Sequence, residues 1–373
     1  MINSVSFNNF RGLDDIKVPL SRLTMLTGSN GVGKTSVLEG LYCLFAQSKL
    51  NVSVLSRYNK AVGLAIHQIG NATPTVSAKE NYNYKLFWDE CPRYGYDECS
   101  VTANDGSYSL KWSYKKAKLN EIDYKPEINP YPVDSTTAFA KWEWILNEDG
   151  SNAVEEKFTR AQVLSPDGGL YFYPLYPVKN ECFTSTCEYL DFSLIRIQAI
   201  DLSFERSKEL TKALQIIEPR VTDVRMNSFT SGLSVVLDNE IELSLGALGN
   251  GTVIWLSTVA LIKAIIDNAK DGNRLKSPMF ILIDEIGAGI HYSIMKEIWK
   301  YLNELSAQYP FIQFVFTSHS DDCIRAYCEA FADSDEASIV RMHRTFNNEK
   351  IVTTEYKKEL FPNIIDGKWE VRG

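Results

Sequence analysis

The chain has 373 residues, 45% of them hydrophobic and 23% charged, with a formal net charge of −8 at pH 7. This composition is typical of a globular protein with a large core, and the negative charge argues against a primary binder of nucleic-acid phosphates. No apolar run could span a bilayer, no secretory signal opens the chain, and its seven cysteines include no C-x-x-C pair. We therefore expect a cytoplasmic protein with free thiols, no membrane partner and no zinc site.

The chain opens with short strands and then a helix. Alternating residues predict a strand at 3–10, a turn at Arg11–Asp15 and a second strand at 16–20. The compact apolar run 22–28 predicts a buried strand. Apolar residues at helical spacing then predict a helix from Lys34 to about Gln47.

Residues 80–200 differ in kind from the rest of the chain. Aromatic residues recur there in alternating patterns, separated by turn signals such as Asn104–Gly106 and Ser165–Gly169. This pattern predicts antiparallel β structure with one or two inserted segments. We expect frequent exposed aromatics here and therefore contacts with a partner. The segment Asp201–Val221 predicts a helix that ends near Glu218, before Pro219.

Apolar runs alternate with helical patterns in the last third of the chain. The predicted order is a hairpin at 233–245, a long helix from about Thr252, a strand at 279–285, a helix at 293–308, a strand at 311–320 and a helix from Asp321. This alternation indicates a parallel sheet that is buried on both faces.

A glycine-rich loop separates the strand that ends near Gly28 from the helix that begins at Lys34. Its residues match G-x-x-x-x-G-K-[ST] at Gly28, Gly33, Lys34 and Thr35, in the strand-to-helix context that the motif requires. Glycines let backbone N–H groups turn inward around an anion, and the helix N-terminus adds positive potential. We expect Lys34 to reach the β- and γ-phosphates of a nucleotide and the Thr35 hydroxyl to bind Mg²⁺.

Polar residues follow two of the apolar strands. Asp284 and Glu285 close the strand at 279–285, and His319 follows the next strand along the chain. In an open α/β sheet, ligands bind beyond the carboxyl ends of the strands. We therefore expect Asp284 to hold Mg²⁺ through its water, Glu285 to act as the general base and His319 to reach the γ-phosphate.

A second glycine-rich turn, Leu245–Gly251, opens the long helix. Gly249, Asn250 and Gly251 place backbone N–H groups at a helix N-terminus, where an anion can bind. One nucleotide needs only one phosphate loop, so this second site makes sense if it covers a nucleotide held by another copy of the chain. A plain glycine cap is the alternative reading.

These motifs, together with FRGL near the N-terminus, resemble those of ABC-class ATPases and, within that class, of the OLD-like ATPases related to SMC and RecF-type repair ATPases. The resemblance covers about residues 1–50 and 200–373. It implies an α/β fold of the ABC-type P-loop NTPase class, with a mostly parallel sheet flanked by helices, an antiparallel β subdomain and a β-rich insertion. We expect an N-terminal ATPase lobe at 1–80, the β-rich region at 81–200 and a helical segment with the C-terminal ATPase lobe at 201–373.

The resemblance implies that ATP and Mg²⁺ are the cofactors, and it assigns residues to them. The ATP-binding positions form the Walker A loop and an arginine that contacts phosphates in related proteins. They are Gly28, Asn30, Gly31, Gly33, Lys34, Thr35, Ser36 and Arg11.

The remaining family motifs lie in the C-terminal part of the chain. Asp284 and Glu285 match the Walker B residue and the catalytic base, and His319 matches the switch histidine. Gly289 and His291 fall in the D-loop. The signature loop, which acts in trans across a head-to-tail nucleotide sandwich dimer, is matched by Gly249, Asn250 and Gly251.

Three departures from the family pattern concern hydrolysis. Gly246 and Ala247 stand where relatives often carry serines, and Gly287 stands where they often carry an acidic residue. Gln47 and Gln68 are both poor candidates for a Q-loop glutamine. Slow or partner-activated hydrolysis is therefore expected.

The leading hypothesis is a Mg²⁺-dependent ATPase that forms a sandwich homodimer or higher oligomer and regulates a separate nuclease or toxin, in bacterial anti-phage defence. A separate effector is expected because no Toprim nuclease signature is found and the acidic stretch Asp333–Asp335 reads as a loop. A DNA-binding repair ATPase of the RecF or SMC sort and a non-hydrolysing nucleotide switch are the alternatives. Membrane transport is disfavoured.

Overall fold

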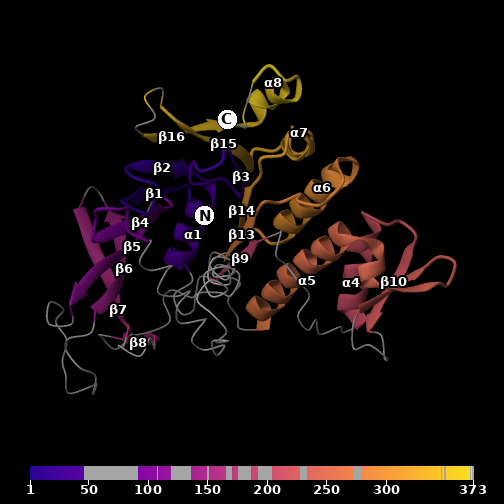
Figure 1. The fold of residues 1–373 in the computed structure, drawn as a ribbon, viewed down its shortest axis with the longest axis horizontal. Coiled ribbons are helices and arrows are strands. Elements are labelled where there is room, and N and C mark those ends of the chain that lie inside the picture. Colours follow the sequence, from indigo (N-terminus) through magenta and orange to yellow (C-terminus); the bar gives the residue numbers. More distant parts are fainter. Residues whose placement is uncertain are drawn as a thin grey trace, which may run out of the picture. The chain divides into compact units, whose positions relative to one another are not determined.

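The fold is taken from a computed structural model, drawn as a ribbon in Figure 1. The described residues are 1–45, 91–106, 108–118, 136–148, 151–164, 170–174, 186–191, 204–226, 233–271, 279–345, 347, 350–369 and 371. The chain divides into two compact units. The first contains residues 1–21, 30–188 and 342–354, and the second contains residues 22–29, 189–341 and 355–373.

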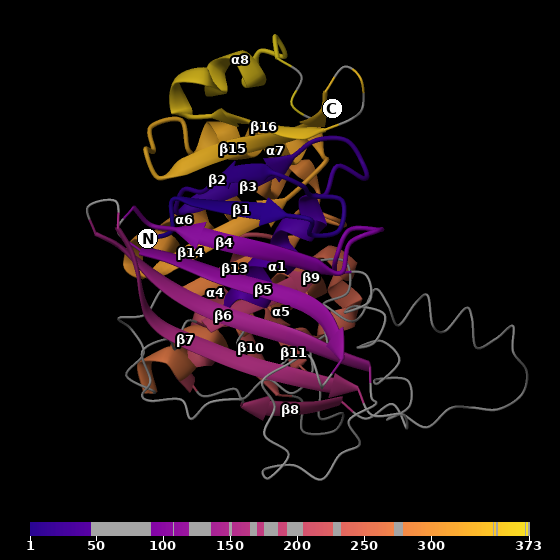
Figure 2. The same cartoon turned by 90° about the vertical axis from the view of Figure 1, so that its left-hand side faces the viewer.

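The first unit is built on an antiparallel sheet. Its strands are β1 (Ser4–Asn8), β2 (Ile16–Pro19), β4 (Glu98–Asn104), β5 (Tyr108–Lys118), β6 (Thr136–Glu148), β7 (Ser151–Leu164) and β8 (Leu170–Pro174). They lie in the order β2-β1-β4-β5-β6-β7-β8, as Figure 2 shows, and each neighbouring pair is antiparallel. The prediction of antiparallel β structure at 80–200 is therefore confirmed for β4 to β8.

Helix α1 (Lys34–Phe45) packs against β4 and β5 in the first unit. Glycine is required at Gly40, because a Cβ there would overlap the Phe7 ring and lie 3.3 Å from the Phe10 ring. Phe10 in turn meets Trp112 edge to face, with ring centroids 6.0 Å apart. The helix that carries the phosphate-loop lysine is thus seated on an aromatic cluster.

The expectation that the aromatics of residues 80–200 are exposed is wrong for β5. Trp112 and Tyr114 are fully buried and stack on each other at 6.2 Å. They face the core because alternation along a strand places every second side chain on the covered side of the sheet. Tyr94 and Tyr96, in the loop before β4, are exposed.

The second unit contains most of a largely parallel sheet. Its strands are β3 (Leu23–Thr27), β9 (Thr186–Asp191), β13 (Met279–Asp284), β14 (Ile312–Thr317), β15 (Ala337–Arg344) and β16 (Ile351–Tyr356), in the order β16-β15-β3-β14-β13-β9. The pairs β15–β3, β3–β14 and β14–β13 are parallel. Every residue of β3, β13 and β14 is buried, as their largely apolar sequences predict.

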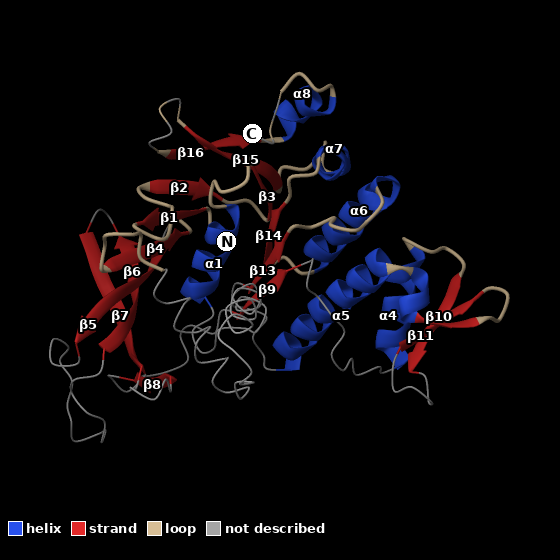
Figure 3. Ribbon diagram, viewed as in Figure 1, coloured by secondary structure: helices blue, strands red, loops and turns tan. Residues whose placement is uncertain are grey.

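The helices of the second unit lie along this sheet and beside a smaller one. They are α4 (Phe204–Gln215), α5 (Asn250–Asp271), α6 (Tyr292–Gln308), α7 (Asp321–Ala330) and α8 (Phe361–Ile365), with short 3-10 turns η3 (Leu245–Leu248) and η4 (Lys358–Leu360). Figure 3 shows α5, α6 and α7 along one face of the parallel sheet, and α4 against the small antiparallel sheet β10 (Val221–Met226), β11 (Leu233–Leu237) and β12 (Glu242–Ser244). The predicted hairpin at 233–245 corresponds to β11 and β12.

Two predicted helix boundaries differ from the structure. Helix α4 ends at Gln215 rather than near Glu218, because the Ile217 and Glu218 N–H groups both bond to the Leu214 carbonyl in a turn. Helix α5 begins at Asn250 rather than at about Thr252. The N–H of Val253 already donates to the Gly249 carbonyl there, at 3.3 Å, so the helix includes Asn250 and Gly251, the last two residues of the glycine-rich turn.

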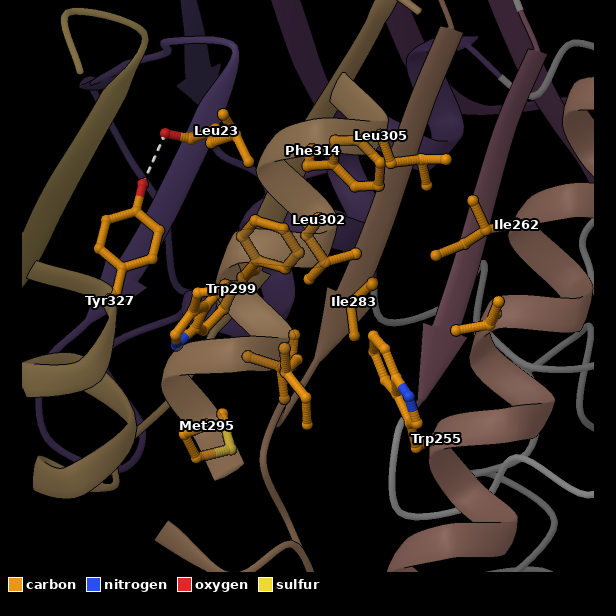
Figure 4. Close-up of a cluster of buried hydrophobic side chains, with 14 of the residues drawn as sticks. Leu23, Trp255, Ile262, Ile283, Met295, Trp299, Leu302, Leu305, Phe314 and Tyr327 are labelled. Carbon is orange, nitrogen blue, oxygen red and sulfur yellow. Dashed lines mark hydrogen bonds between the residues drawn. The ribbon is translucent and has the colours of Figure 1, made fainter. Parts of the chain in front are cut away.

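The core of the second unit lies between α5, α6, α7 and the parallel sheet (Figure 4). Trp299 of α6 is at its centre, with its ring centroid 5.0 Å from those of Phe316 and Tyr327. Its indole N–H donates to the Cys323 carbonyl at 3.2 Å, so the buried nitrogen is satisfied. Helix α6 thereby fixes both α7 and the strand β14 beneath it.

Tyr327 ties helix α7 to the sheet. Its buried hydroxyl donates to the Leu23 carbonyl at 2.8 Å (the dashed line in Figure 4) and lies 3.2 Å from the Ser338 carbonyl. Replacing it by phenylalanine leaves these carbonyls without that donor in the core, and we expect Tyr327→Phe to lower stability by about 1–3 kcal/mol. Thermal and urea unfolding measure this. Tyr292→Phe, at an exposed tyrosine, is the control, and equal unfolding midpoints for the two variants would contradict the assignment.

Candidate active site

Three parallel strands of the second unit end side by side. Strand β14 pairs with β3 on one side, where Thr317 is opposite Leu26, and with β13 on the other, where Phe316 is opposite Ile283. The Ser318 N–H extends the first pairing by donating to the Leu26 carbonyl at 3.2 Å. Since parallel strands end at the same edge, the polar residues at and after these strand ends gather at one edge of the sheet.

Asp284 and Glu285 stand at the end of β13 in different surroundings. Asp284 is only 6% exposed, and its Oδ1 accepts a short hydrogen bond from the Thr317 hydroxyl. Glu285 is exposed, and its backbone lies in the left-handed region with a φ of 55°. Its N–H donates to Thr317 Oγ1 at 2.8 Å. The Asp284 carboxylate is therefore buried and hydrogen-bonded at the sheet edge, and Glu285 is exposed to solvent.

The turn after Glu285 rests on helix α7. The Cys323 thiol lies 3.5 Å from the Ile286 carbonyl, and a Cβ at Gly287 would lie 3.2 Å from that sulfur. Burial raises the pKa of the Cys323 thiol to about 12, so the sulfur stays protonated and can donate. The structure thus explains a glycine at 287: its φ is 92° and its side-chain space is filled.

His319 follows β14 at the same edge and is exposed. The next residue, Ser320, caps helix α7 by accepting from the Cys323 N–H at 3.4 Å. The chain therefore turns into α7 directly after His319. The structure places Asp284 at the end of β13, Glu285 directly after it and His319 beyond the end of the neighbouring strand β14, at the edge of the sheet that the sequence predicts.

The phosphate loop leads from β3 to α1 and passes from the second unit to the first between Ser29 and Asn30. Gly28, Gly31 and Gly33 all have positive φ angles, of 131°, 78° and 94°. A Cβ at Gly33 would lie 2.6 Å from Leu13, so the FRGL turn packs directly on the loop. Helix α1 begins at Lys34, as predicted, with Lys34, Thr35 and Ser36 partly buried.

Arg11 lies beside helix α1 in the first unit. Its guanidinium forms a 3.0 Å ion pair with Glu39, whose side chain is 1% exposed. The arginine has a φ of 53°, and its N–H donates to the Cys91 carbonyl at 2.8 Å, which fastens the FRGL turn to the segment before β4. The sequence singled out Arg11 but not Glu39, since an acidic residue inside a helix carries no signal of its own.

The predicted signature loop forms the start of α5 in the second unit. Gly249 has a φ of 95° and ends the turn η3, and Asn250 and Gly251 begin the helix. A Cβ at Gly251 would overlap the Gly289 carbonyl oxygen. The segments predicted as signature loop and D-loop therefore touch through their backbones. His291, in the segment predicted as D-loop, caps α6 by accepting from the Ser293 N–H.

Two family models match the chain. One is described as "AAA ATPase domain" and matches residues 1–136. The other is described as "AAA domain, putative AbiEii toxin, Type IV TA system" and matches residues 118–323, which is more than half of the chain.

Curated relatives and solved structures are more distant. The ATP/GTP phosphatase of Helicobacter pylori (strain ATCC 700392 / 26695) is 22% identical over 362 residues, 90% of each chain. The DNA replication and repair protein RecF of Acholeplasma laidlawii (strain PG-8A) is 49% identical over 43 residues, 11% of this chain and 12% of RecF. A structure of the recombination mediator RecF with ATPrS aligns over 96% of this chain and 98% of its own, with a TM-score of 0.41 and 8% identity. The RecF-ATP structure aligns over 95% and 99%, with a TM-score of 0.36 and 10% identity.

The helices in the described part of the chain include none that is both long and apolar enough to cross a membrane.

The strand order, the loop between β3 and α1 and the family models agree on an α/β fold of the P-loop NTPase class. The chain belongs to the family of ATPase domains described as "AAA domain, putative AbiEii toxin, Type IV TA system".

Proposed function

We propose that this protein is a Mg²⁺-dependent ATPase of the ABC class, with OLD-like and RecF-like relatives, that dimerises around ATP and controls a separate effector. The observation that carries this proposal is the pair of carboxylates, one buried and one exposed, at the sheet edge where β3 enters the phosphate loop. Ligands of open α/β sheets bind at such an edge.

The phosphate loop supplies the ATP contacts in this proposal. Its positive-φ glycines present backbone N–H groups to an anion, and the N-terminus of α1 adds its dipole. Lys34 would pair with the β- and γ-phosphates as a point charge. The other loop contacts would come from Gly28, Asn30, Gly31, Gly33 and Ser36. Arg11 would join them, since a guanidinium has enough donors to bind an anion while it keeps its ion pair with Glu39.

The donor chemistry fits Mg²⁺ held together with a nucleotide. Among the described residues, no group of three or more histidine, cysteine or acidic side chains could hold a metal ion. Mg²⁺ is commonly bound through one or two carboxylates together with substrate phosphates and water. Asp284 and the Thr35 hydroxyl offer the hard oxygen atoms for this, and bound Mg²⁺ would neutralise the charge that develops on the phosphates.

Glu285 and His319 would act on the hydrolytic step. An exposed carboxylate next to the metal-binding aspartate can accept a proton from the attacking water. His319 would donate a hydrogen bond to the γ-phosphate. The unusual signature residues Gly246 and Ala247 offer no hydroxyl to that phosphate, so we propose that turnover is slow until a partner binds.

A second copy would complete the site. The N-terminus of α5, with Gly249, Asn250 and Gly251, would cover the γ-phosphate of a nucleotide held by the other subunit, in a head-to-tail dimer. The effector is proposed to be a nuclease or toxin in anti-phage defence. The family description, which names a putative AbiEii toxin of a type IV TA system, supports this setting.

Lys34→Ala tests the phosphate contacts. Losing a charged hydrogen bond to phosphate should weaken ATP binding about 10- to 100-fold. Isothermal titration with ATP measures the change. Lys300→Ala, at an exposed lysine that pairs with Glu297 of the same helix, is the matched control and should bind ATP as the original protein does. Equal affinities for the two variants would contradict the role of Lys34.

Glu285→Gln tests the general base and the dimer together. Turnover should fall about 10²- to 10⁴-fold because the amide cannot take a proton, while ATP affinity is kept. The bound state should then persist, and light scattering should detect an ATP-dependent dimer. Glu297→Gln, an exposed glutamate of α6, is the control. Turnover that survives in Glu285→Gln would rule out this base, and a monomer at saturating ATP would rule out the sandwich.

A DNA-coupled ATPase of the RecF sort is the second candidate, favoured by the 43-residue match to RecF. It predicts duplex binding that weakens about 10³-fold or more between roughly 50 and 200 mM salt. The net charge of −8 opposes it. Gel shifts with and without ATP at the two salt concentrations separate the candidates, since an effector-coupled ATPase should show no such slope.

A further inference from the structure

We propose that Thr317 is a positioning residue that sets the geometry of Asp284 and Glu285, an inference that rests on the ATPase function proposed above. Thr317 is not among the site residues predicted from the sequence. It is the last residue of β14, the strand between β3 and β13, and it is 1% exposed. Its position lets it reach the end of β13 from the side.

Thr317 holds three consecutive residues through three hydrogen bonds. Its hydroxyl donates to Asp284 Oδ1, and the same oxygen accepts from the Glu285 N–H at 2.8 Å. Its backbone carbonyl accepts from the Ile286 N–H at 3.0 Å. A hydroxyl has one proton and two lone pairs, so a single side chain serves both a carboxylate and an N–H. We call this arrangement the Thr317 clamp.

The clamp holds Glu285 in a strained backbone conformation. A φ of 55° is unfavourable for a residue with a Cβ, and such a conformation persists only when its surroundings enforce it. Regular pairing of β13 with β14 ends at Ile283 and Phe316, and the clamp continues the attachment to β14 beyond that point. With these bonds in place, the Asp284 carboxylate is buried and the Glu285 carboxylate is exposed to solvent.

The chemistry of the clamp predicts how substitutions rank. Valine has the shape of threonine but neither donates nor accepts, so it would remove the bond to Asp284 and leave the Glu285 N–H without this acceptor. Serine keeps the hydroxyl and should restore the function. Hydrogen-bond partners of metal ligands typically change metal affinity by about 10- to 100-fold when they are removed.

The experiment compares Thr317→Val, Thr317→Ser and Thr317→Ala with a matched control, Thr27→Val. Thr27 is also buried at the end of a neighbouring strand, and its hydroxyl makes no hydrogen bond within the described residues. The first measurement is hydrogen exchange of a peptide that contains residues 284–286, in protein without nucleotide or metal. The second is the Mg²⁺ concentration that half-saturates ATP turnover, alongside ATP affinity without Mg²⁺.

Thr317→Val should exchange faster at 284–286 and need about 10- to 100-fold more Mg²⁺, with Mg²⁺-free ATP affinity unchanged. Thr317→Ser and Thr27→Val should behave as the original protein does. If the valine variant does not fold, the same two measurements are made on Thr317→Ala, which also lacks the hydroxyl and should show the same changes. Exchange and Mg²⁺ requirement both within about twofold of the original protein would overturn the clamp. If the original protein binds no ATP, the ATPase proposal fails, and the exchange measurement still decides whether the clamp holds residues 284–286.

Discussion

The parallel pairing of β14 with both β3 and β13 is the interaction on which the candidate site depends. Parallel strands end at the same edge, so whatever follows each of them is brought together. The register places Thr317 opposite Leu26 and Phe316 opposite Ile283. A slip by one residue would turn every side chain to the other face and move Thr317 away from Asp284. Every residue of the three strands is buried, so such a slip would have to repack both faces of the sheet.

The same burial explains why polar chemistry is confined to the edge. A carboxylate in the middle of β13 would be removed from water without a hydrogen-bond or ion-pair partner. Burying an unpaired charge in this way costs much free energy. Asp284, the last residue of the strand, is buried but accepts a hydrogen bond from a neutral hydroxyl. Glu285 is exposed, and its backbone φ lies in the left-handed region. Two adjacent acidic residues therefore receive different surroundings from one turn, which suits a metal ligand and a proton acceptor.

Much of this arrangement could be predicted from the sequence, because apolar runs and the G-x-x-x-x-G-K-[ST] spacing report strands, a loop and a helix directly. The start of α1 at Lys34 follows from those signals, and β13 ends one residue before its predicted end at 285. Strand β14 ends at Thr317, three residues before its predicted end at 320. Thr317 could not be found in this way, since its role depends on register with a strand 33 residues away. The Arg11–Glu39 ion pair is equally hidden, because it joins a turn to the inside of a helix.

The close contact between Gly251 and Gly289 extends this logic to the two loops expected to meet a second subunit. Any Cβ at position 251 would overlap the Gly289 carbonyl oxygen, so only glycine permits this approach of the two backbones. The turn that starts at Glu285 therefore lies against the first turn of α5 at Gly289. The segment after the proposed general base and the helix N-terminus proposed to cover the partner's nucleotide are in backbone contact within one subunit.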